Sequence, residues 1–157
     1  MPEFDGISEY VKSGSRRLRD AEELLQPPTL HPKEQGADTR HLRGAIYLSG
    51  YGVECLLKAY IISCQRGGSR LSEARDAIRA SGNPIRDICG EAGHDLRYLL
   101  SLTDLEARMD PEKLRQMSLS AKWSSSWRYD PRRVSREDAD ARVEAARSLV
   151  SWIYTQI

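Results

Sequence analysis

The sequence predicts an all-α protein, an antiparallel helical bundle of about four to six helices around one long central helix. Two observations predict this class. Apolar residues recur at spacings of three and four along most of the chain, and no segment shows the alternation typical of a strand. Residues 40–66 form the one stretch that is apolar on both flanks, as a helix in the middle of a bundle is. We expect a single domain over residues 1–157, long enough for one hydrophobic core.

The composition limits the possible settings of the protein. The formal net charge is +1, so no global field attracts nucleic acid, and any such binding needs a local basic patch. The three cysteines are an odd count without CxxC spacing, and we expect reduced thiols that lie mostly in the core of an intracellular, cytoplasmic protein. The N-terminal residues carry no secretory signal, and no apolar run approaches ~18 residues, so we expect no membrane span.

The first helix is expected over residues 5–26. Arg16, Arg17 and Arg19 would point mainly outward from it, and Pro27-Pro28 would end it. Residues 27–38 then form a polar loop that is long for a helix connection. The buried stripe of the helix consists of Ile7, Val11, Gly14, Leu18, Ala21 and Leu25.

A polar stripe runs along the central helix between its two apolar flanks. Glu54 and Lys58 stand four residues apart in the favourable order, so they can pair with each other. The stripe is then either an internal ion pair or the lining of a binding cleft. Gly44, Gly50 and Gly52 weaken the helix and indicate that another backbone comes close. The stripe consists of Arg40, Arg43, Tyr47, Tyr51, Glu54 and Lys58.

Later helices are marked by their starting residues. His94 or Asp95 would cap a helix that runs to about Met109. Asp110 followed by proline would cap the next helix, and Ser135 would cap the last one. A short helix is also expected between the Gly67-Gly68 break and about Ala80.

Residues 123–134 form an expected loop that is aromatic and basic. Trp123, Trp127 and Tyr129 lie near several arginines in it. Such rings either stack on bases of a nucleic acid or plug the hydrophobic core. The sequence leaves both interpretations open.

Three separated motifs stand in order along the chain. They are Ala45-x-Tyr47-x3-Tyr51-x2-Glu54-x2-Leu57-Lys58-Ala59, Gly93-His94-Asp95-Leu96-x2-Leu99 and Arg128-Tyr129-Asp130-Pro131. Together they resemble the HEPN family, the "higher eukaryotes and prokaryotes nucleotide-binding" helical domains, over about residues 40–155. The resemblance implies a bundle that often forms a homodimer through its long helices. It also implies a role in toxin–antitoxin, phage-defence or RNA-processing systems, frequently beside a nucleotidyltransferase partner.

Many members of that family are metal-independent ribonucleases with an arginine followed, after four to six residues, by a histidine. Here the corresponding positions after Arg128 hold Arg133, Val134 and Ser135, and seven residues separate Arg86 from His94. The expected function is therefore a non-catalytic binding module for a partner protein, nucleotide or RNA, with no cofactor and no metal. P-loop, dinucleotide-binding and nucleophile-elbow motifs are absent from the sequence. The ligand-binding candidates are Tyr47, Tyr51, Glu54, Lys58, Asp95, Arg128 and Tyr129.

Two other functions stay open. The first is an endoribonuclease toxin in which His94 moves a proton and Arg128 stabilises the transition state. The second is a structural adaptor bundle in which Glu54 pairs with Lys58, or across the bundle with Arg128, and His94 is a capping or buried hydrogen-bonded residue. The sequence does not identify the ligand.

Overall fold

The structure is a computed structural model that describes residues 6–26, 39–66, 68–129 and 133–157. Its described residues form seven α-helices and two 3-10 helices, and the sole β-type pairing among them is an isolated bridge between Gly6 and Arg70. The predicted all-α class is therefore confirmed. The expected loop 27–38 lies outside the described residues.

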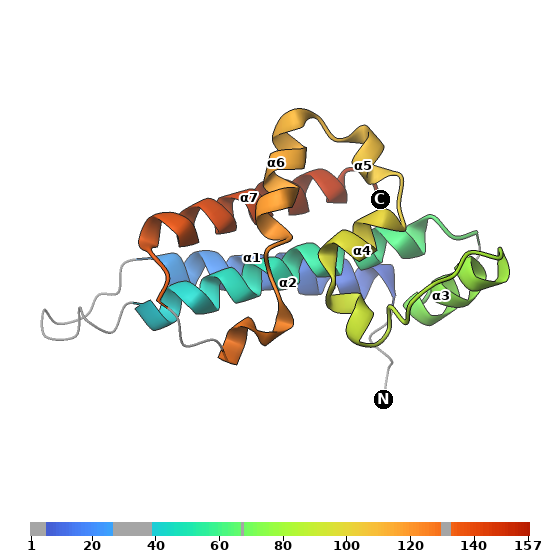
Figure 1. The fold of residues 1–157 in the computed structure, drawn as a ribbon, viewed down its shortest axis with the longest axis horizontal. Helices are drawn as coiled ribbons and strands as arrows, with labels where there is room; N and C mark the ends of the chain where they lie inside the picture. The colour runs from blue at the N-terminus through green and yellow to red at the C-terminus, as the bar shows by residue number, and fades with distance from the viewer. Residues whose placement is uncertain (1–5, 27–38, 67, 130–132) are drawn as a thin grey trace, which may run out of the picture.

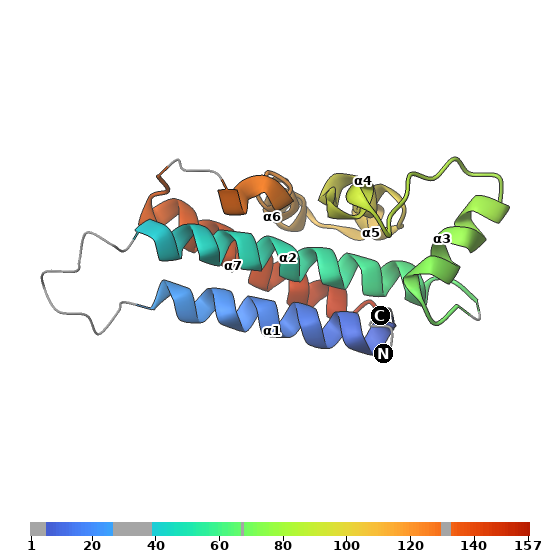
Figure 2. The ribbon, with the colours of Figure 1, turned by 90° about the horizontal axis from the view of Figure 1, so that it is seen from below.

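Three long helices make the body of the fold (Figure 2). The chain enters through α1, returns through α2, and passes through several short helices on one side of α2 before α7 (Figures 1 and 2). Helix α7 runs in the same direction as α2 and opposite to α1. The elements are α1 (Ile7–Leu25), α2 (Thr39–Ser63), α3 (Leu71–Ala80), η2 (Glu91–His94), α4 (Leu96–Ser101), α5 (Leu105–Arg108), α6 (Pro111–Ser120), η3 (Ser125–Tyr129) and α7 (Arg136–Tyr154).

Helix α2 is the central helix that the sequence predicts. Every residue from Gly52 to Ile62 is buried, because α1, α7, α3, α4 and η3 pack on this helix. Helix α1 comes closest where a Cβ added to Gly14 would lie 3.0 Å from the carbonyl oxygen of Gly52. A Cβ on Gly52 would in turn lie 3.2 Å from the carbonyl oxygen of Gly14. The predicted close approach of another backbone is confirmed at this pair.

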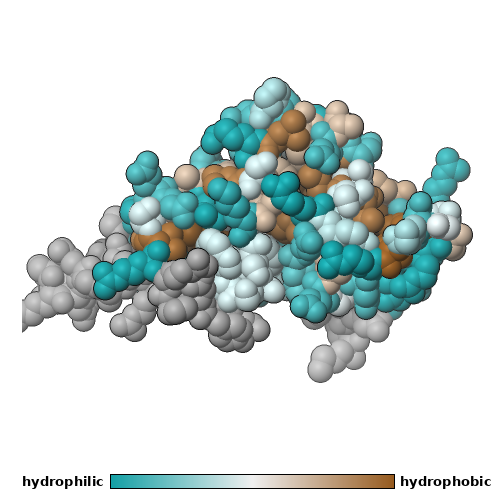
Figure 3. Space-filling view, viewed as in Figure 1, coloured by the Kyte–Doolittle hydropathy of each residue, from teal (hydrophilic) through white to brown (hydrophobic). Residues whose placement is uncertain are grey.

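The same helix meets the length and composition of a membrane span. The window His41–Ser63 qualifies, although 83% of it is buried inside the fold. Core helices of soluble proteins pass the same test, so this is weak evidence for a span. On the face of the molecule seen in Figure 3, hydrophobic residues show in several separate places among hydrophilic ones.

Predicted helix starts agree with the structure at two caps. Asp110 accepts a hydrogen bond from the backbone N–H of Lys113, at 2.7 Å. Ser135 accepts one from the N–H of Asp138, at 3.0 Å. These side chains satisfy N–H groups that have no partner within the helix.

The prediction of one continuous helix to about Met109 is wrong, because α4 ends at Ser101 and α5 begins at Leu105. The hydroxyl of Thr103 explains the break. It donates to the carbonyl oxygen of Leu100 at 2.7 Å and accepts from the N–H of Leu105 at 3.2 Å. A side chain that bonds to nearby backbone groups in this way favours a turn over a continuing helix. The division of this helix brings the number of helices to seven.

A hydrogen-bonded tyrosine ties the end of α2 to this turn. The Tyr60 hydroxyl donates to Oδ1 of Asp104 at 2.5 Å, and the Arg108 guanidinium donates to the Tyr60 oxygen at 2.9 Å. Burial raises the pKa of Tyr60 well above its ordinary value of 10.0, and the hydrogen bond to Asp104 makes a second, smaller contribution. The same hydrogen bond lowers the pKa of the Asp104 carboxyl.

We therefore expect the Tyr60 contribution to folding to disappear in alkali. A group whose folded pKa is raised stabilises the fold fully below its unfolded pKa, here about 10, and loses that stabilisation as the pH rises through the folded pKa. Urea unfolding of the wild type at pH 8 and pH 10.5 should show a fall in stability that is smaller in Tyr60→Phe. Tyr154→Phe, whose ring is exposed, is the control, and an equal fall in Tyr60→Phe and Tyr154→Phe would contradict the assignment.

Candidate functional site

A buried carboxylate joins the central helix to the histidine turn. Glu54 is 1% exposed. Its Oε1 accepts a hydrogen bond from Nζ of Lys58 at 2.7 Å, and its Oε2 lies 3.0 Å from Nδ1 of His94. An ionised carboxylate only accepts hydrogen bonds, so this contact favours the imidazole proton on Nδ1. We call these three residues the Glu54 cluster. The predicted Glu54–Lys58 pair is confirmed. Among the described residues, the contact that links Glu54 to another part of the fold is the one with His94.

The backbone around His94 is fixed by its neighbours. A Cβ on Gly93 would lie 2.0 Å from the carbonyl oxygen of Ile88, closer than any real contact, so only glycine fits there. Asp95 caps α4 by accepting from the N–H of Tyr98 at 3.0 Å. The capping role predicted for His94 or Asp95 thus belongs to Asp95. The His94 side chain is 38% exposed, which leaves part of the ring within reach of solvent.

A polar cavity of about 230 Å³ lies between α1 and α2 beside this cluster. We call it the α1–α2 slot. The two helices run antiparallel, so Tyr10 lies opposite Lys58 and Arg17 lies opposite Tyr51. Nζ of Lys58 is 5.9 Å from the ring centre of Tyr10, and the guanidinium carbon of Arg17 is 5.7 Å from that of Tyr51. The lining residues are Glu9, Tyr10, Ser13, Arg17, Tyr51, Glu54, Cys55 and Lys58.

Burial keeps the weak acids of the slot protonated. It raises the pKa of the Cys55 thiol from 9.0 to about 12, with a further contribution from the negative charge of Glu54. Burial and the same carboxylate raise the pKa of Tyr51. At neutral pH the slot therefore presents a thiol and a phenol that can donate hydrogen bonds.

The cysteines follow the prediction only in part. None of the three is in a disulfide, but Cys64 and Cys89 are exposed and Cys55 alone is buried, so the expectation that they lie mostly in the core is wrong. Cys64 lies just beyond the end of α2 at Ser63.

This difference in burial predicts the reactivity of the thiols. Iodoacetamide reacts with the thiolate form of cysteine. At pH 8 it should modify the exposed Cys64 and Cys89 in the native protein, and leave unmodified Cys55, which is buried and has a raised pKa. Mass spectrometry of the labelled peptides provides the measurement. All three should react in guanidinium chloride, and comparable labelling of Cys55 in the native protein would contradict its placement.

The structure brings together some of the predicted site residues and separates others. Tyr51, Glu54 and Lys58 line the slot, and His94 joins them through Glu54. Asp95 lies outside this group, because its carboxylate contacts the N–H of Tyr98 and, at 3.5 Å, the Arg86 guanidinium.

Tyr47 belongs to an aromatic group instead of the slot. Its ring centre is 6.4 Å from that of Tyr51 and 6.0 Å from that of Trp123. Trp123 is buried, and its indole N–H donates to the carbonyl oxygen of Tyr47 at 3.0 Å. The interpretation of the aromatic segment as a closure of the core is thus confirmed for Trp123.

The side chains of Arg128 and Tyr129 lie outside the described residues, so a contact of Arg128 with His94 or Glu54 stays a prediction. The backbone of η3 does lie on the same side of α2 as the histidine turn (Figures 1 and 2). Within η3, Trp127 packs against the buried cluster of Leu42 and Ile46. Glu54 follows Ile46 by eight residues, roughly 12 Å along a helix.

The four slot residues on α1, Glu9, Tyr10, Ser13 and Arg17, were missed as site residues by sequence reasoning. Arg17 is exposed, as expected, but its guanidinium lies over the Tyr51 ring at the slot. A signal was present, because Tyr10, Ser13 and Arg17 recur at three- and four-residue spacing beside Gly14. That spacing places them at the edge of the buried stripe of α1, facing the partner helix.

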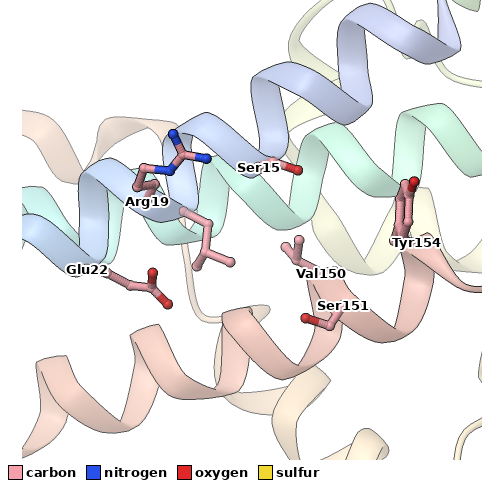
Figure 4. Close-up of a pocket in the computed structure, with 7 residues that line it drawn as sticks. Ser15, Arg19, Glu22, Val150, Ser151 and Tyr154 are labelled. Atoms are coloured by element: carbon pink, nitrogen blue, oxygen red, sulfur yellow. The ribbon is translucent and has the colours of Figure 1, made fainter.

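A second cavity, of about 340 Å³, lies between α1 and α7 (Figure 4). Leu18 and Val150 supply its apolar lining, and Arg19 and Glu22 supply opposite charges. It contains none of the predicted site residues. Among the described residues, no group of three His, Cys, Asp or Glu side chains could hold a metal ion.

Fold and site together define an all-α bundle in which a buried Glu–Lys pair contacts a partly exposed histidine next to a polar slot. No protein-family model, curated protein sequence or solved structure matches the chain.

Proposed function

We propose that the chain is a HEPN-type helical binding module that acts without catalysis, with a nucleotide, RNA or partner protein as its ligand. The observation that supports this proposal is the Glu54 cluster. It links the motif of the central helix to the Gly-His-Asp motif, two segments that carry the resemblance and stand 40 residues apart in the chain. The cluster lies beside a cavity that is open to a small ligand.

The geometry favours binding over catalysis. Both oxygens of Glu54 are engaged, one by Lys58 and the other by His94. The carboxylate is also buried, so a substrate proton does not reach it directly. The chain also lacks the arginine–histidine spacing of the ribonucleases it resembles.

Binding and cleavage can be measured on the same purified protein. Labelled single-stranded RNA, nucleoside monophosphates and nucleoside triphosphates are titrated, and the RNA is then analysed on a gel after incubation in EDTA. We expect binding without cleavage. A protein that binds neither RNA nor nucleotide, and stays monomeric at high concentration, would contradict the proposal.

A metal-independent endoribonuclease is the second candidate, and one observation favours it. His94 is partly exposed, and a buried carboxylate orients its ring, as in catalytic bases that a third group holds in place. Cleavage that persists in EDTA and disappears in His94→Ala would support this function. Cleavage that survives both His94→Ala and Arg128→Ala would exclude it.

The resemblance also supports a homodimer and a nucleotidyltransferase or other defence-system partner. Light scattering across a concentration series tests the dimer. Copurification with the product of a neighbouring nucleotidyltransferase reading frame, where one exists, tests the partner.

A further inference from the structure

We infer that the α1–α2 slot is an oxyanion site, in which Arg17 and the hydroxyl groups beside it hold the phosphate or carboxylate of a small molecule. This inference rests on the proposed function, since it assigns a ligand class to the same binding module. It adds α1 to a site whose predicted residues lie on α2, at the histidine turn and in the aromatic segment.

Arg17 is the cation available to a ligand. Within the part of the chain that the structure describes, its recorded contact is the ring of Tyr51, and no carboxylate there pairs with it. A guanidinium is a planar fork of donors that matches the geometry of carboxylate and phosphate oxygens. Ser13 and Tyr51 line the same slot and add two hydroxyl donors.

Neither acidic group of the slot is paired with Arg17 among the described residues. Glu54 pairs with Lys58. Glu9 lies eight residues before Arg17, roughly 12 Å along the helix, and a Cβ on Gly6 would come within 2.6 Å of its Oε2. Arg17 is therefore the slot cation that is left for an anionic ligand.

The dimensions limit the size of the ligand. A volume of about 230 Å³ lies below the ~300–1,000 Å³ of pockets for drug-sized molecules. The two cation–ring pairs, Lys58 with Tyr10 and Arg17 with Tyr51, stand seven residues apart on each helix, roughly 10 Å. This length suits a ligand with one oxyanion group and one ring, and the rings of Tyr10 and Tyr51 can contact a planar ligand ring.

Calorimetric titration with four probes tests the inference: inorganic phosphate, uridine 5′-monophosphate, uridine and benzoate. The monophosphate should bind the wild type, and uridine should bind at least about tenfold more weakly, since it lacks the anionic group that forms charged hydrogen bonds with Arg17. Arg17→Ala should weaken the monophosphate by about tenfold or more. The matched control is Arg16→Ala, an exposed arginine of the same helix that does not line the slot, and it should leave the affinity within about twofold.

The outcomes separate this inference from the proposed function. Nucleotide or RNA binding that is unchanged in Arg17→Ala overturns the inference and leaves the binding module intact. Phosphate or benzoate binding that depends on Arg17, without binding of nucleotide, RNA or partner, supports the inference and contradicts the proposed function; benzoate alone would identify a carboxylate ligand. Uridine binding equal to the monophosphate, or no binding of any probe to the wild type, overturns the inference. Circular dichroism confirms that both variants are folded.

Discussion

Glu54→Ala is expected to lower the free energy of unfolding by about 3–5 kcal/mol. The substitution would leave the Lys58 ammonium, 7% exposed, buried without its counter-charge. It would also remove the carboxylate that holds His94. Urea denaturation at pH 7 measures the loss, and a Glu54→Ala variant within about 1 kcal/mol of the wild type would contradict this account of the cluster.

A double variant separates the charge from the packing. Lys58→Met alone leaves a buried carboxylate that keeps only His94, so it should also be strongly destabilised. The combination of Glu54→Leu with Lys58→Met removes both charges at similar volume, and it should recover most of the lost stability because a buried ion pair contributes little net free energy over apolar packing. His94→Ala should cost less than Glu54→Ala, since the imidazole is partly solvated.

These stability measurements also separate the structural and binding roles of the polar stripe. A large loss in Glu54→Ala is what an adaptor bundle with an internal ion pair requires, and it does not test ligand binding. Arg17 provides that test independently, because it is exposed and its substitution should leave the fold intact. A stable Glu54→Ala variant that has lost its ligand would instead favour a direct binding role for the carboxylate.

The sequence predicted the long helices because their evidence is local. A stretch apolar on both flanks can only be stable in the middle of a bundle, and caps such as Asp110 and Ser135 act within one turn. The break between α4 and α5 escaped prediction although its cause is also local. The leucine spacing continues through it and favours a helix, while the Thr103 hydroxyl bonds to backbone groups two and three residues away and favours a turn.

The candidate site shows a different limit. The Glu54–Lys58 pair follows from a four-residue spacing, whereas the contact of Glu54 with His94 depends on how Gly93 packs against the Ile88 backbone. The part of the slot on α1 depends on the antiparallel register between α1 and α2. That register follows from the contact of Gly14 with Gly52, which no spacing within either helix specifies.

Trp123→Ala is expected to cost about 3–5 kcal/mol, the range for removal of a buried aromatic side chain. Trp123 is 6% exposed and packs over the middle of α2, where a Cβ on Gly50 would lie 2.3 Å from its ring. Its loss would open a cavity against Tyr47 and Tyr51 and remove the indole hydrogen bond. Thermal and urea unfolding of the variant measure the effect.

Trp127→Ala is the matched control, because this second tryptophan of the same segment is only partly buried and lies near the start of α2. It should cost less than half as much as Trp123→Ala. Gly50→Ala should approach the effect of Trp123→Ala, since the added methyl group occupies the position of the indole. Equal losses of stability in the two tryptophan variants would contradict a specific contribution of the Trp123 contact with α2. A Gly50→Ala variant as stable as the wild type would show that the ring does not rest on α2 at this glycine.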